Sequence, residues 1–344
     1  LPTSAGESRL ADPDARPDAT ERQGRALQTT ALAHEVGTTF EYSNANYNLL
    51  GLIIEAASGQ TYADYVQTHI FDPLDMRHTY TSPAAAQRNG LALGHRYWFA
   101  APRPAPNLPI PHGSLPAGLL ISTAEDMAHY LIAHLNGGRY GDVQILSAAG
   151  VAELQRGVAD FPMPGFGTRQ YGMGWFVEQI GGAKLVWHSG TLPDFAAHMA
   201  LLPGQKTGFV LLINANHHMM VPVFIELGMG VTALLAGLQP GPSPLHMDAW
   251  MPWALRGLLL IPALQIAGVA WTRRLRGRRA LLPLLANMLA GLLLLKPMLG
   301  KRRGYLRLYL PDYAWIAQIC GGFAILWSCL RTVLTCRRSG ENPT

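Results

Sequence analysis

The sequence predicts an α/β (α+β) sandwich, in which an antiparallel sheet is flanked by helices, followed by three transmembrane α-helices. Helical patterns dominate residues 40–136, and strand patterns separated by tight turns fill residues 171–214. Helices followed by a meander of strands are typical of a layered domain with an antiparallel sheet. After residue 249, three apolar runs of about 20 residues are each long enough to cross a bilayer as a helix.

Charge divides the chain into two parts. Residues 1–243 contain 13 Lys and Arg against 19 Asp and Glu, a net charge of −6, whereas residues 244–344 contain 14 against 3, a net charge of +11. Basic groups beside long apolar runs are typical of membrane proteins, in which Lys and Arg stay in the cytoplasm or meet anionic lipid. A nucleic-acid partner is not indicated, because no basic stripe lies on the acidic part.

The N-terminal half is predicted to be mainly helical. Residues 1–30 are rich in Ala, Asp, Arg, Pro and Thr and predict an irregular loop. Residues 45–57 are apolar on nearly all sides, which predicts a buried helix that ends at Ser58-Gly59. A capping box that starts at Thr61 predicts a second helix, which runs to about Ile70.

A long surface loop is predicted over residues 81–116, because this segment carries seven prolines. The next helix has a clear start, since Ser122 and Glu125 form a second capping box. Asn136 and the two glycines after it predict the end of that helix.

An antiparallel meander is predicted next. Tyr171–Ile180 has a strand pattern, Gly181-Gly182 fits a two-residue hairpin turn, and Ala183–Trp187 fits the second strand. Phe195–Leu202 predicts a third strand, and Phe209–Asn214 is an uninterrupted apolar run that suits a central strand.

The last part of the first domain is an apolar helix near residues 221–235, followed by a Pro-rich linker. We therefore expect a first domain over residues 1–238, a linker over residues 239–249 and a membrane domain with three helices over residues 250–338.

The three predicted membrane spans are Trp250–Trp271, Ala280–Leu299 and Tyr313–Cys336. Aromatic residues frame the first span and open the third, as they do at membrane interfaces. The charged residues inside the spans lie near the ends, from which long side chains reach the headgroups; they are Arg256, Lys296 and Arg331. Buried core helices of a soluble domain are the alternative, which the arginine clusters between the runs disfavour.

The positions of the arginines predict how the chain is oriented in the membrane. The loop at residues 272–279 has five arginines and no acidic residue, so we expect it in the cytoplasm, with residues 1–243 on the extracytoplasmic side. The second loop disagrees, since it would carry its basic residues outward. We give the first loop priority because it is shorter and denser in charge.

The positions of the cysteines and the identity of the first residue limit what can be expected of disulfides and of the N-terminus. Cys320, Cys329 and Cys336 all lie in the last apolar run, which excludes a disulfide from residues 1–319. The chain begins at Leu1 rather than at Met and shows no signal-peptide pattern, so we expect that an N-terminal segment is missing.

The first chemical motif is Tyr42-Ser43-Asn44, at the start of the buried helix. A helix N-terminus holds side chains rigidly, and its partial positive charge favours a tyrosinate or an anionic intermediate. A tyrosine whose pKa is lowered by cationic neighbours can take a proton from a serine, and Asn44 can orient an ammonium group or a substrate amide. The alternative is a helix cap formed by Ser43 or Asn44, with Tyr42 as a packing residue.

The second motif is His188-Ser189-Gly190, at the end of a strand expected at the sheet edge beside a cleft. Gly190 allows a substrate backbone to approach closely. His188 can hold a carboxylate, and the backbone N–H that follows the motif can stabilise an oxyanion. A surface histidine at a strand end is the alternative.

Together the two motifs and their flanks resemble the serine β-lactamase and penicillin-binding protein (DD-peptidase) superfamily, most nearly the class C β-lactamases. The matching segments span about residues 35–216; they are Phe40–Tyr47, Ile70–Met76, Pro116–Gly118, Ser122–Met127 and Trp187–Thr191. The resemblance implies general acid/base work for Tyr42 and a positioning role for Asn44. It also implies a third motif of His188 and Gly190, with the Thr191 backbone as one oxyanion donor.

The chain departs from the family in one respect: no serine has a lysine three residues later, so the nucleophile motif Ser-x-x-Lys is absent. In the family this motif lies upstream of Tyr-x-Asn by more residues than precede Tyr42. Leu1-Pro2-Thr3 resembles the continuation of a segment that follows the nucleophile helix, which favours truncation over mutation. Ser4, Ser8 and Ser43 have no neighbour that resembles an activating base.

Other candidates are weaker. Lys206-Thr207-Gly208 matches the family's Lys-Thr-Gly in letters, but it lies in the turn after the next strand and cannot line the cleft. The histidines have no metal-ligand spacing, so we expect neither a metal nor another cofactor.

The sequence thus predicts a membrane-anchored serine hydrolase that acts on amide or ester carbonyls through an acyl-enzyme. Its expected substrates are cell-wall D-amino-acid peptides, β-lactams or small esters, and the lipid bilayer is its other partner. The chain alone is expected to be inactive. The alternative is a non-catalytic module with the same fold that binds or senses the cell wall.

Overall fold

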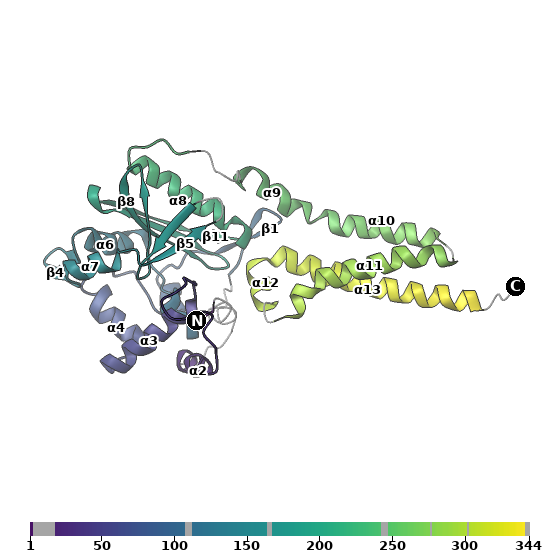
Figure 1. Ribbon diagram of the computed structural model, residues 1–344, viewed down its shortest axis with the longest axis horizontal. Coiled ribbons are helices and arrows are strands. Elements are labelled where there is room, and N and C mark those ends of the chain that lie inside the picture. Colours follow the sequence, from purple (N-terminus) through teal and green to yellow (C-terminus); the bar gives the residue numbers. More distant parts are fainter. Residues whose placement is uncertain are drawn as a thin grey trace. The chain divides into compact units, whose positions relative to one another are not determined.

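The computed structural model describes residues 1–2, 18–106, 112–163, 167–241, 247–275, 277–300 and 303–340. The chain divides into two compact units. The first contains residues 1–96 and 104–248, and the second contains residues 97–103 and 249–344. Figure 1 labels the elements of both units.

A six-stranded antiparallel sheet forms the centre of the first unit, in the order β10-β9-β8-β7-β6-β5 (Figure 1). Its strands are β5 (Ala159–Met163), β6 (Gly167–Tyr171), β7 (Phe176–Ile180), β8 (Ala183–Thr191), β9 (Ala196–Leu202) and β10 (Thr207–Ile213). Strands that are consecutive in sequence are neighbours in the sheet, because tight turns join them. At Gly181-Gly182 both residues have positive φ, 55° and 81°, which confirms the predicted two-residue turn.

Three details of the predicted strands were wrong. Tyr171–Ile180 is not one strand, because Gly172 and Gly174 form a turn between β6 and β7. β10 lies at the end of the sheet, although its apolar run suited a central strand. An apolar run reports that both faces of a strand are covered and does not report how many strands pair with it. His188 lies on β8, an interior strand, rather than at the sheet edge.

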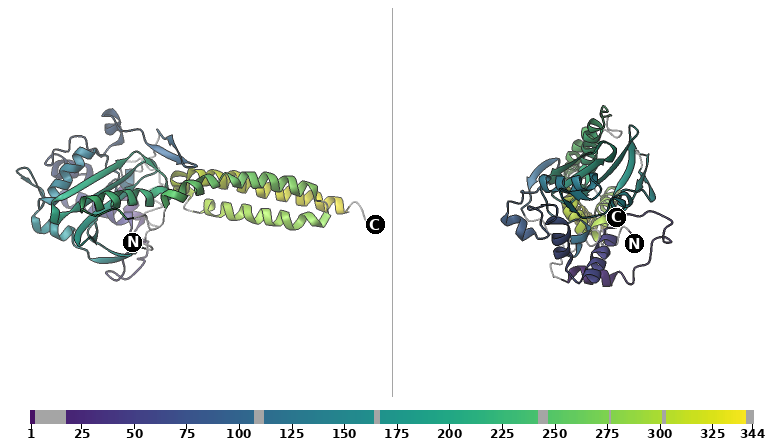
Figure 2. Two further views of the ribbon diagram at one scale, coloured as in Figure 1. Left: turned by 90° about the horizontal axis from the view of Figure 1, so that it is seen from above. Right: turned by 90° about the vertical axis from the view of Figure 1, so that its left-hand side faces the viewer.

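Helices cover both faces of the sheet (Figures 1 and 2). Alternate residues of a strand point to opposite faces. On one face Val186 and Leu201 pack with Leu131 of α6 (Ala124–Leu135), and on the other Trp187 packs with Ile225 of α8 (Val221–Leu235). The arrangement confirms the predicted α/β sandwich.

Shorter elements complete the first unit. The helices are α2 (Ala19–Ala26), α3 (Asn44–Ser58), α4 (Tyr62–Val66), η1 (Gln67–Phe71), α5 (Pro83–Arg88), η2 (His112–Ala117), α7 (Ala148–Leu154), η3 (Pro203–Gln205) and η4 (His218–Met220). The short strands are β1 (His95–Trp98), β3 (Arg139–Tyr140), β4 (Val143–Gln144) and β11 (Ala215–Asn216), whereas β2 (Ala101–Pro104) belongs to the second unit except for its last residue. β1 pairs with β11 in parallel and continues past residue 96 into the second unit.

Both predicted irregular segments contain regular structure. α2 lies within residues 1–30, and α5, β1, β2 and η2 lie within residues 81–116. Pro83 is the first residue of α5, where its missing N–H costs nothing, so prolines there mark a helix start rather than a loop. β1 depends on pairing with β11, a contact distant in sequence that local patterns do not reveal.

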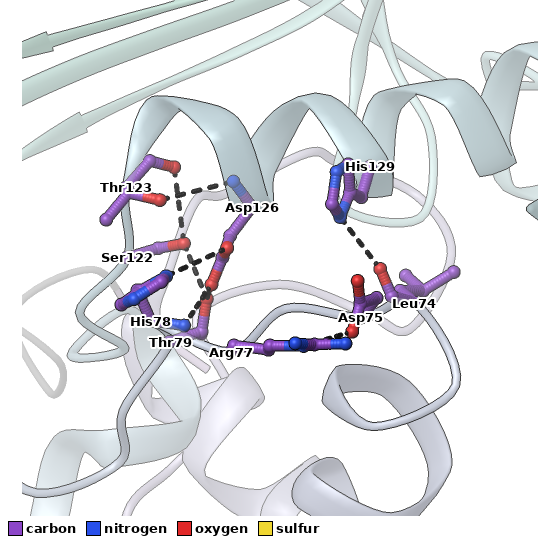
Figure 3. A network of polar contacts seen from close by, with 9 residues as sticks. All are labelled: Leu74, Asp75, Arg77, His78, Thr79, Ser122, Thr123, Asp126 and His129. Carbon is purple, nitrogen blue, oxygen red and sulfur yellow. Dashed lines mark hydrogen bonds and ion pairs between the residues drawn. The ribbon is translucent and has the colours of Figure 1, made fainter.

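A buried carboxylate fixes the start of α6 (Figure 3). Thr123 Oγ1 accepts a hydrogen bond from the Asp126 backbone N–H at 3.2 Å, so the N-cap is Thr123 and not the predicted Ser122. The Asp126 carboxylate accepts hydrogen bonds from His78 N at 2.7 Å and from Thr79 Oγ1 at 2.6 Å. The network holds the loop at residues 78–79 against the helix that covers the sheet.

The second unit is helical, with α9 (Met247–Gly257), α10 (Leu260–Arg274), η5 (Gly277–Ala280), α11 (Leu281–Leu295), η6 (Lys296–Leu299), α12 (Arg303–Tyr309) and α13 (Pro311–Gly340). α11 and α13 run antiparallel and pack closely. A Cβ on Gly291 would lie 2.7 Å from the backbone oxygen of Gly321, so small residues set this distance. Asn287 Nδ2 donates to Ala324 O at 3.0 Å, which adds a polar contact.

Four helical stretches are long and apolar enough to cross a membrane, judged by length and composition: His218–Leu235, Ala249–Arg274, Leu281–Leu299 and Pro311–Leu334. The last three coincide with the three predicted spans. The first contains α8, whose inner face packs on the sheet of the first unit.

Candidate active site

Tyr42, Ser43 and Asn44 lie at the start of α3, as predicted. Ser43 has extended backbone, φ −147° and ψ 119°, and its side chain makes no capping hydrogen bond. Its Oγ instead donates to Pro2 O at 3.1 Å. The capping alternative therefore fails for Ser43, while Asn44 is already the first helical residue.

The structure brings the two motifs together. The ring centroids of Tyr42 and His188 are 6.2 Å apart. Each ring also contacts Tyr171, at 6.1 Å in both cases. A helix start and an interior strand thus contribute to one cluster of aromatic and titratable side chains.

Two hydroxyl groups extend this cluster. Tyr47 Oη and Tyr171 Oη are hydrogen-bonded at 2.7 Å, and Tyr171 Oη lies 3.4 Å from His188 Nε2. Phe176 stacks on the imidazole of His188, with centroids 5.3 Å apart. Sequence reasoning missed Tyr47 and Tyr171. The sequence could have pointed to Tyr47, because it lies three residues after Asn44 on the same face of the helix. No local pattern pointed to Tyr171.

Burial controls the protonation of these groups. Burial, with a smaller contribution from the neighbouring Tyr47, raises the pKa of Tyr42 to about 12. Burial also raises the pKa of Tyr171 and lowers the pKa of His188, the latter opposed by a backbone hydrogen bond at Ser189. The phenols are therefore protonated and the imidazole is neutral at neutral pH.

The expected lowering of the Tyr42 pKa is therefore wrong for this chain. That expectation needed a cation beside the phenol. The family's Ser-x-x-Lys motif would bring a lysine to the site, and residues 1–344 do not contain this motif.

Gly190 and Thr191 are exposed at the end of β8. β7 pairs with β8 only as far as Trp187, so β8 extends past the end of its neighbour. Leu192 N donates to Phe195 O on the β9 side. Because successive residues of a strand direct their N–H groups to opposite sides, the Thr191 N–H points to the side that β7 has left.

Two buried polar contacts hold the segment after Thr191. Asn216 Nδ2 of β11 donates to Thr191 Oγ1 and to Leu192 O. Asp194 is fully buried and accepts two hydrogen bonds from Arg96, at 2.9 and 2.6 Å. Burial raises the pKa of Asp194, and Arg96 opposes that shift. Sequence reasoning did not find this ion pair, which joins β1 to the loop.

The other candidates do not join the cluster. Thr207 pairs with Leu202 at one end of β9, whereas Thr191 pairs with Ala196 at the other end. Lys206-Thr207-Gly208 therefore lies toward the opposite end of β9 from Thr191. Ser4 and Ser8 lie outside the residues that the structure describes.

A family model described as Beta-lactamase matches residues 3–223. The chain belongs to this family of serine hydrolases. Protein flp of Staphylococcus aureus (strain MW2) is 32% identical over 206 residues, which cover 59% of this chain and 38% of flp. Penicillin-binding protein 4 of Amycolatopsis lactamdurans is 28% identical over 206 residues, 54% of its length. The chain therefore spans less than two thirds of the length of each of these relatives.

Solved structures agree with this assignment. The octameric penicillin-binding protein homologue from Pyrococcus abyssi is similar with a TM-score of 0.60 and 27% identity, over 71% of this chain and 55% of that one. A class C β-lactamase has a TM-score of 0.50 and 18% identity, over 65% and 66%, which is a likeness of fold alone. The resemblance inferred from the motifs is confirmed.

Proposed function

We propose that residues 1–238 provide the acid/base and oxyanion side of a serine hydrolase site, and that residues 250–338 anchor this domain in a membrane through a linker at residues 239–249. The proximity of Tyr42 and His188, with ring centroids 6.2 Å apart, carries the proposal. Family membership supports a serine nucleophile and an acyl-enzyme.

In the proposed reaction the lysine of a Ser-x-x-Lys motif supplied from outside residues 1–344 lies beside Tyr42 and favours its tyrosinate. The Oγ of the serine attacks an amide or ester carbonyl, and this tyrosinate takes the hydroxyl proton and later gives it to the leaving amine or alcohol. Asn44 orients the substrate amide. The Thr191 N–H stabilises the oxyanion, and Gly190 leaves room for the substrate. Water then releases the acyl group. His188 is neutral in this chain, so it contacts the substrate as a hydrogen-bonding group.

The substrate is proposed to be a small molecule or peptide with such a carbonyl: a cell-wall D-amino-acid peptide, a β-lactam or an ester. These share a carbonyl flanked by groups that can meet the Asn44 amide and the His188 imidazole.

Exposed leucines support the membrane anchor. In the second unit Leu264, Leu282 and Leu326 are 70%, 76% and 71% exposed. Such apolar surface is stable in lipid and unfavourable in water. We propose three spans, one through α9 and α10 and the others through α11 and α13, with residues 1–243 on the extracytoplasmic side.

A non-catalytic module that binds or senses the cell wall is the second candidate. It gains weight only if no Ser-x-x-Lys is encoded upstream of Leu1, because a binding site needs no nucleophile. The two candidates differ in whether a covalent acyl-enzyme forms.

A covalent probe distinguishes them. The reading frame upstream of Leu1 is sequenced, and any product that adds an in-frame Ser-x-x-Lys is treated with fluorescent penicillin and with a fluorophosphonate. The enzyme proposal expects labelling of that product and none of residues 1–344. Labelling of residues 1–344 would contradict the assignment of the nucleophile, and absence of the motif upstream would favour the binding module.

Tyr42→Phe tests the proposed base in the labelled product. Loss of a general base lowers turnover by roughly 10²–10⁴. Tyr65→Phe, on α4 and away from the cluster, is the matched control and is expected to keep full turnover. Unchanged turnover in Tyr42→Phe would remove the phenol from the mechanism.

A further inference from the structure

The outward face of α8 is apolar. Leu227 and Leu234 are 52% and 59% exposed within the part of the chain that the structure describes. At about 100° per residue, these two leucines and Val231 lie within about 60° of one another around the helix axis. Glu226 is the only charged residue in the sequence of α8, and it lies about 100° from Leu227. Leu227, Val231 and Leu234 thus form an apolar stripe, called here the outer stripe.

The inward face of α8 is occupied by the sheet. Ile225 and Met229 pack against the core that contains Trp187, and Thr232 is 1% exposed. The stretch His218–Leu235 is long and apolar enough to cross a membrane, by length and composition. It cannot cross one while α8 packs on the sheet, because the polar loops and strand edges of the first unit would follow it into lipid. The outer stripe therefore marks a contact surface for lipid or for another protein.

The chain connects α8 closely to the predicted membrane anchor. α8 ends at Leu235 and α9 begins at Met247, so residues 236–246 join them. This segment reaches at most about 40 Å even when it is fully extended. Trp250 and Trp253 open the first predicted span, and such aromatic residues favour the membrane interface. A tether of this length makes docking on the bilayer intramolecular, so a weak apolar contact is sufficient.

We propose that the outer stripe of α8 docks on the extracytoplasmic surface of the bilayer that the second unit crosses. The docking rests on the proposed membrane anchor and goes beyond it, because spans and a linker would hold the first unit without bringing it into contact with lipid. A bilayer fits the stripe better than a protein partner does. Leucine and valine are under-represented among the residues that dominate binding between proteins, and the bilayer is the apolar surface within reach of the tether.

Docking through α8 also orients the candidate active site. Successive residues of a strand point to opposite faces of the sheet, so His188 points away from the face on which Trp187 packs with α8. The His188 side of the sheet is then directed away from the bilayer. A substrate reaches it from the aqueous phase rather than from within the membrane.

Nitroxide labels on the full chain in phosphatidylcholine liposomes test the docking. The label is attached at Gly230→Cys, which lies about 60° from Leu227 and where a Cβ meets nothing within 4 Å. The chain's own cysteines are first replaced by alanine; they are Cys320, Cys329 and Cys336. Electron paramagnetic resonance measures collisions with oxygen, which concentrates in lipid, and with a nickel chelate, which stays in water. We expect a higher ratio of oxygen to nickel collisions at Gly230→Cys than at Val143→Cys, on β4, where the native side chain is 43% exposed.

Removing the leucines tests the outer stripe itself. In the Gly230→Cys background, Leu227→Gln with Leu234→Gln should lower the ratio of docked to undocked chains by roughly 10-fold for each leucine. Leu227→Ala with Leu234→Ala keeps a high helix propensity and should act in the same direction, which guards against a folding defect in the glutamine pair. Leu93→Gln with Val143→Gln is the matched control, since both side chains are similarly exposed elsewhere on the first unit, and it should dock as the wild type does.

Three outcomes would overturn the docking. Nickel collisions at Gly230→Cys as frequent as at Val143→Cys would place the outer stripe in water. Few collisions with either reagent would mean that protein covers it, such as a second copy of the chain. An equal loss of docking in the matched control would remove the stripe from the contact. Alkaline carbonate tests the anchor separately: a chain that it extracts from the liposomes contradicts the anchor, whereas a retained chain with a water-exposed label contradicts the docking alone.

Discussion

At the scale of residues, Tyr171 connects groups that the two sequence motifs supply. Its hydroxyl lies between Tyr47 Oη and His188 Nε2. If Nε2 accepts from Tyr171, the neutral imidazole carries its proton on Nδ1, and Tyr171 in turn accepts from Tyr47. The tautomer of His188 would then be set by a tyrosine outside both motifs.

Tyr171→Phe is therefore expected to mix the His188 tautomers. A net hydrogen-bond contribution of about 0.5–1.5 kcal/mol corresponds to a change of roughly 2- to 10-fold in the tautomer ratio. The ratio is read from the ¹⁵N chemical shifts of the ring nitrogens of His188. Tyr47→Phe keeps the Tyr171 hydroxyl and should have the smaller effect. Identical ¹⁵N shifts in wild type and Tyr171→Phe would show that the hydroxyl does not set the tautomer.

The sequence predicted the parts of the site that have local motifs. Tyr42 and His188 could be placed together because their flanks resemble one family. Tyr171 and Asp194 could not be found, since their importance comes from partners distant in sequence, His188 and Arg96. The predicted lowering of the pKa of Tyr42 was wrong, because that prediction depended on a lysine that would come with a Ser-x-x-Lys motif, which residues 1–344 do not contain.

At the scale of elements, α8 approaches the sheet closely at one glycine. A Cβ on Gly228 would lie 2.4 Å from the imidazole of His198, which stacks between Trp187 and Phe209. His198 is also held by Ser189 Oγ at 2.8 Å, so it has little freedom to move. The close approach of α8 to the sheet therefore depends on the absence of a Cβ at Gly228.

Gly228→Ala is expected to destabilise the first unit by about 1–3 kcal/mol, the usual cost of overpacking. Gly230→Ala is the matched control, because a Cβ there meets nothing within 4 Å and alanine favours helix by up to about 1 kcal/mol. Hydrogen exchange of β8 and β9 amides measures the difference. Equal protection in the two variants would mean that α8 shifts freely on the sheet.

The α11–α13 contact offers a second matched pair. A Cβ on Gly321 would lie 2.8 Å from the Leu295 side chain and 3.0 Å from Gly291 O, whereas on Gly322 it meets nothing within 4 Å. Gly321→Ala should lower the midpoint of thermal unfolding in detergent, and Gly322→Ala should not. A lower midpoint in Gly322→Ala alone would place the helix contact on another face.

At the scale of the whole molecule, two buried histidines link stability to pH. Burial lowers the pKa of His134 to about 4, and burial with the nearby His188 lowers that of His198 to about 4. The unfolded value is near 6.5. Between these values the unfolded chain binds more protons, so stability is full above pH 6.5 and is lost as pH falls toward 4.

Each histidine should contribute up to about 3 kcal/mol to this loss. Urea unfolding of the full chain at a series of pH values measures it. His134→Gln and His198→Gln should each flatten the dependence between pH 6.5 and 4. A wild-type slope in both variants would show that other groups cause the acid sensitivity.

The position of β10 has a consequence for handling the protein. As the last strand of its sheet, β10 directs one row of backbone N–H and C=O groups away from β9, and Leu212 on it is 41% exposed. Such a border is a template for any extended peptide, including an identical strand of another molecule. Because β10 is the last of the described strands in its sheet, we expect concentrated preparations of this chain to self-associate through backbone pairing, even where detergent fully covers the apolar helices.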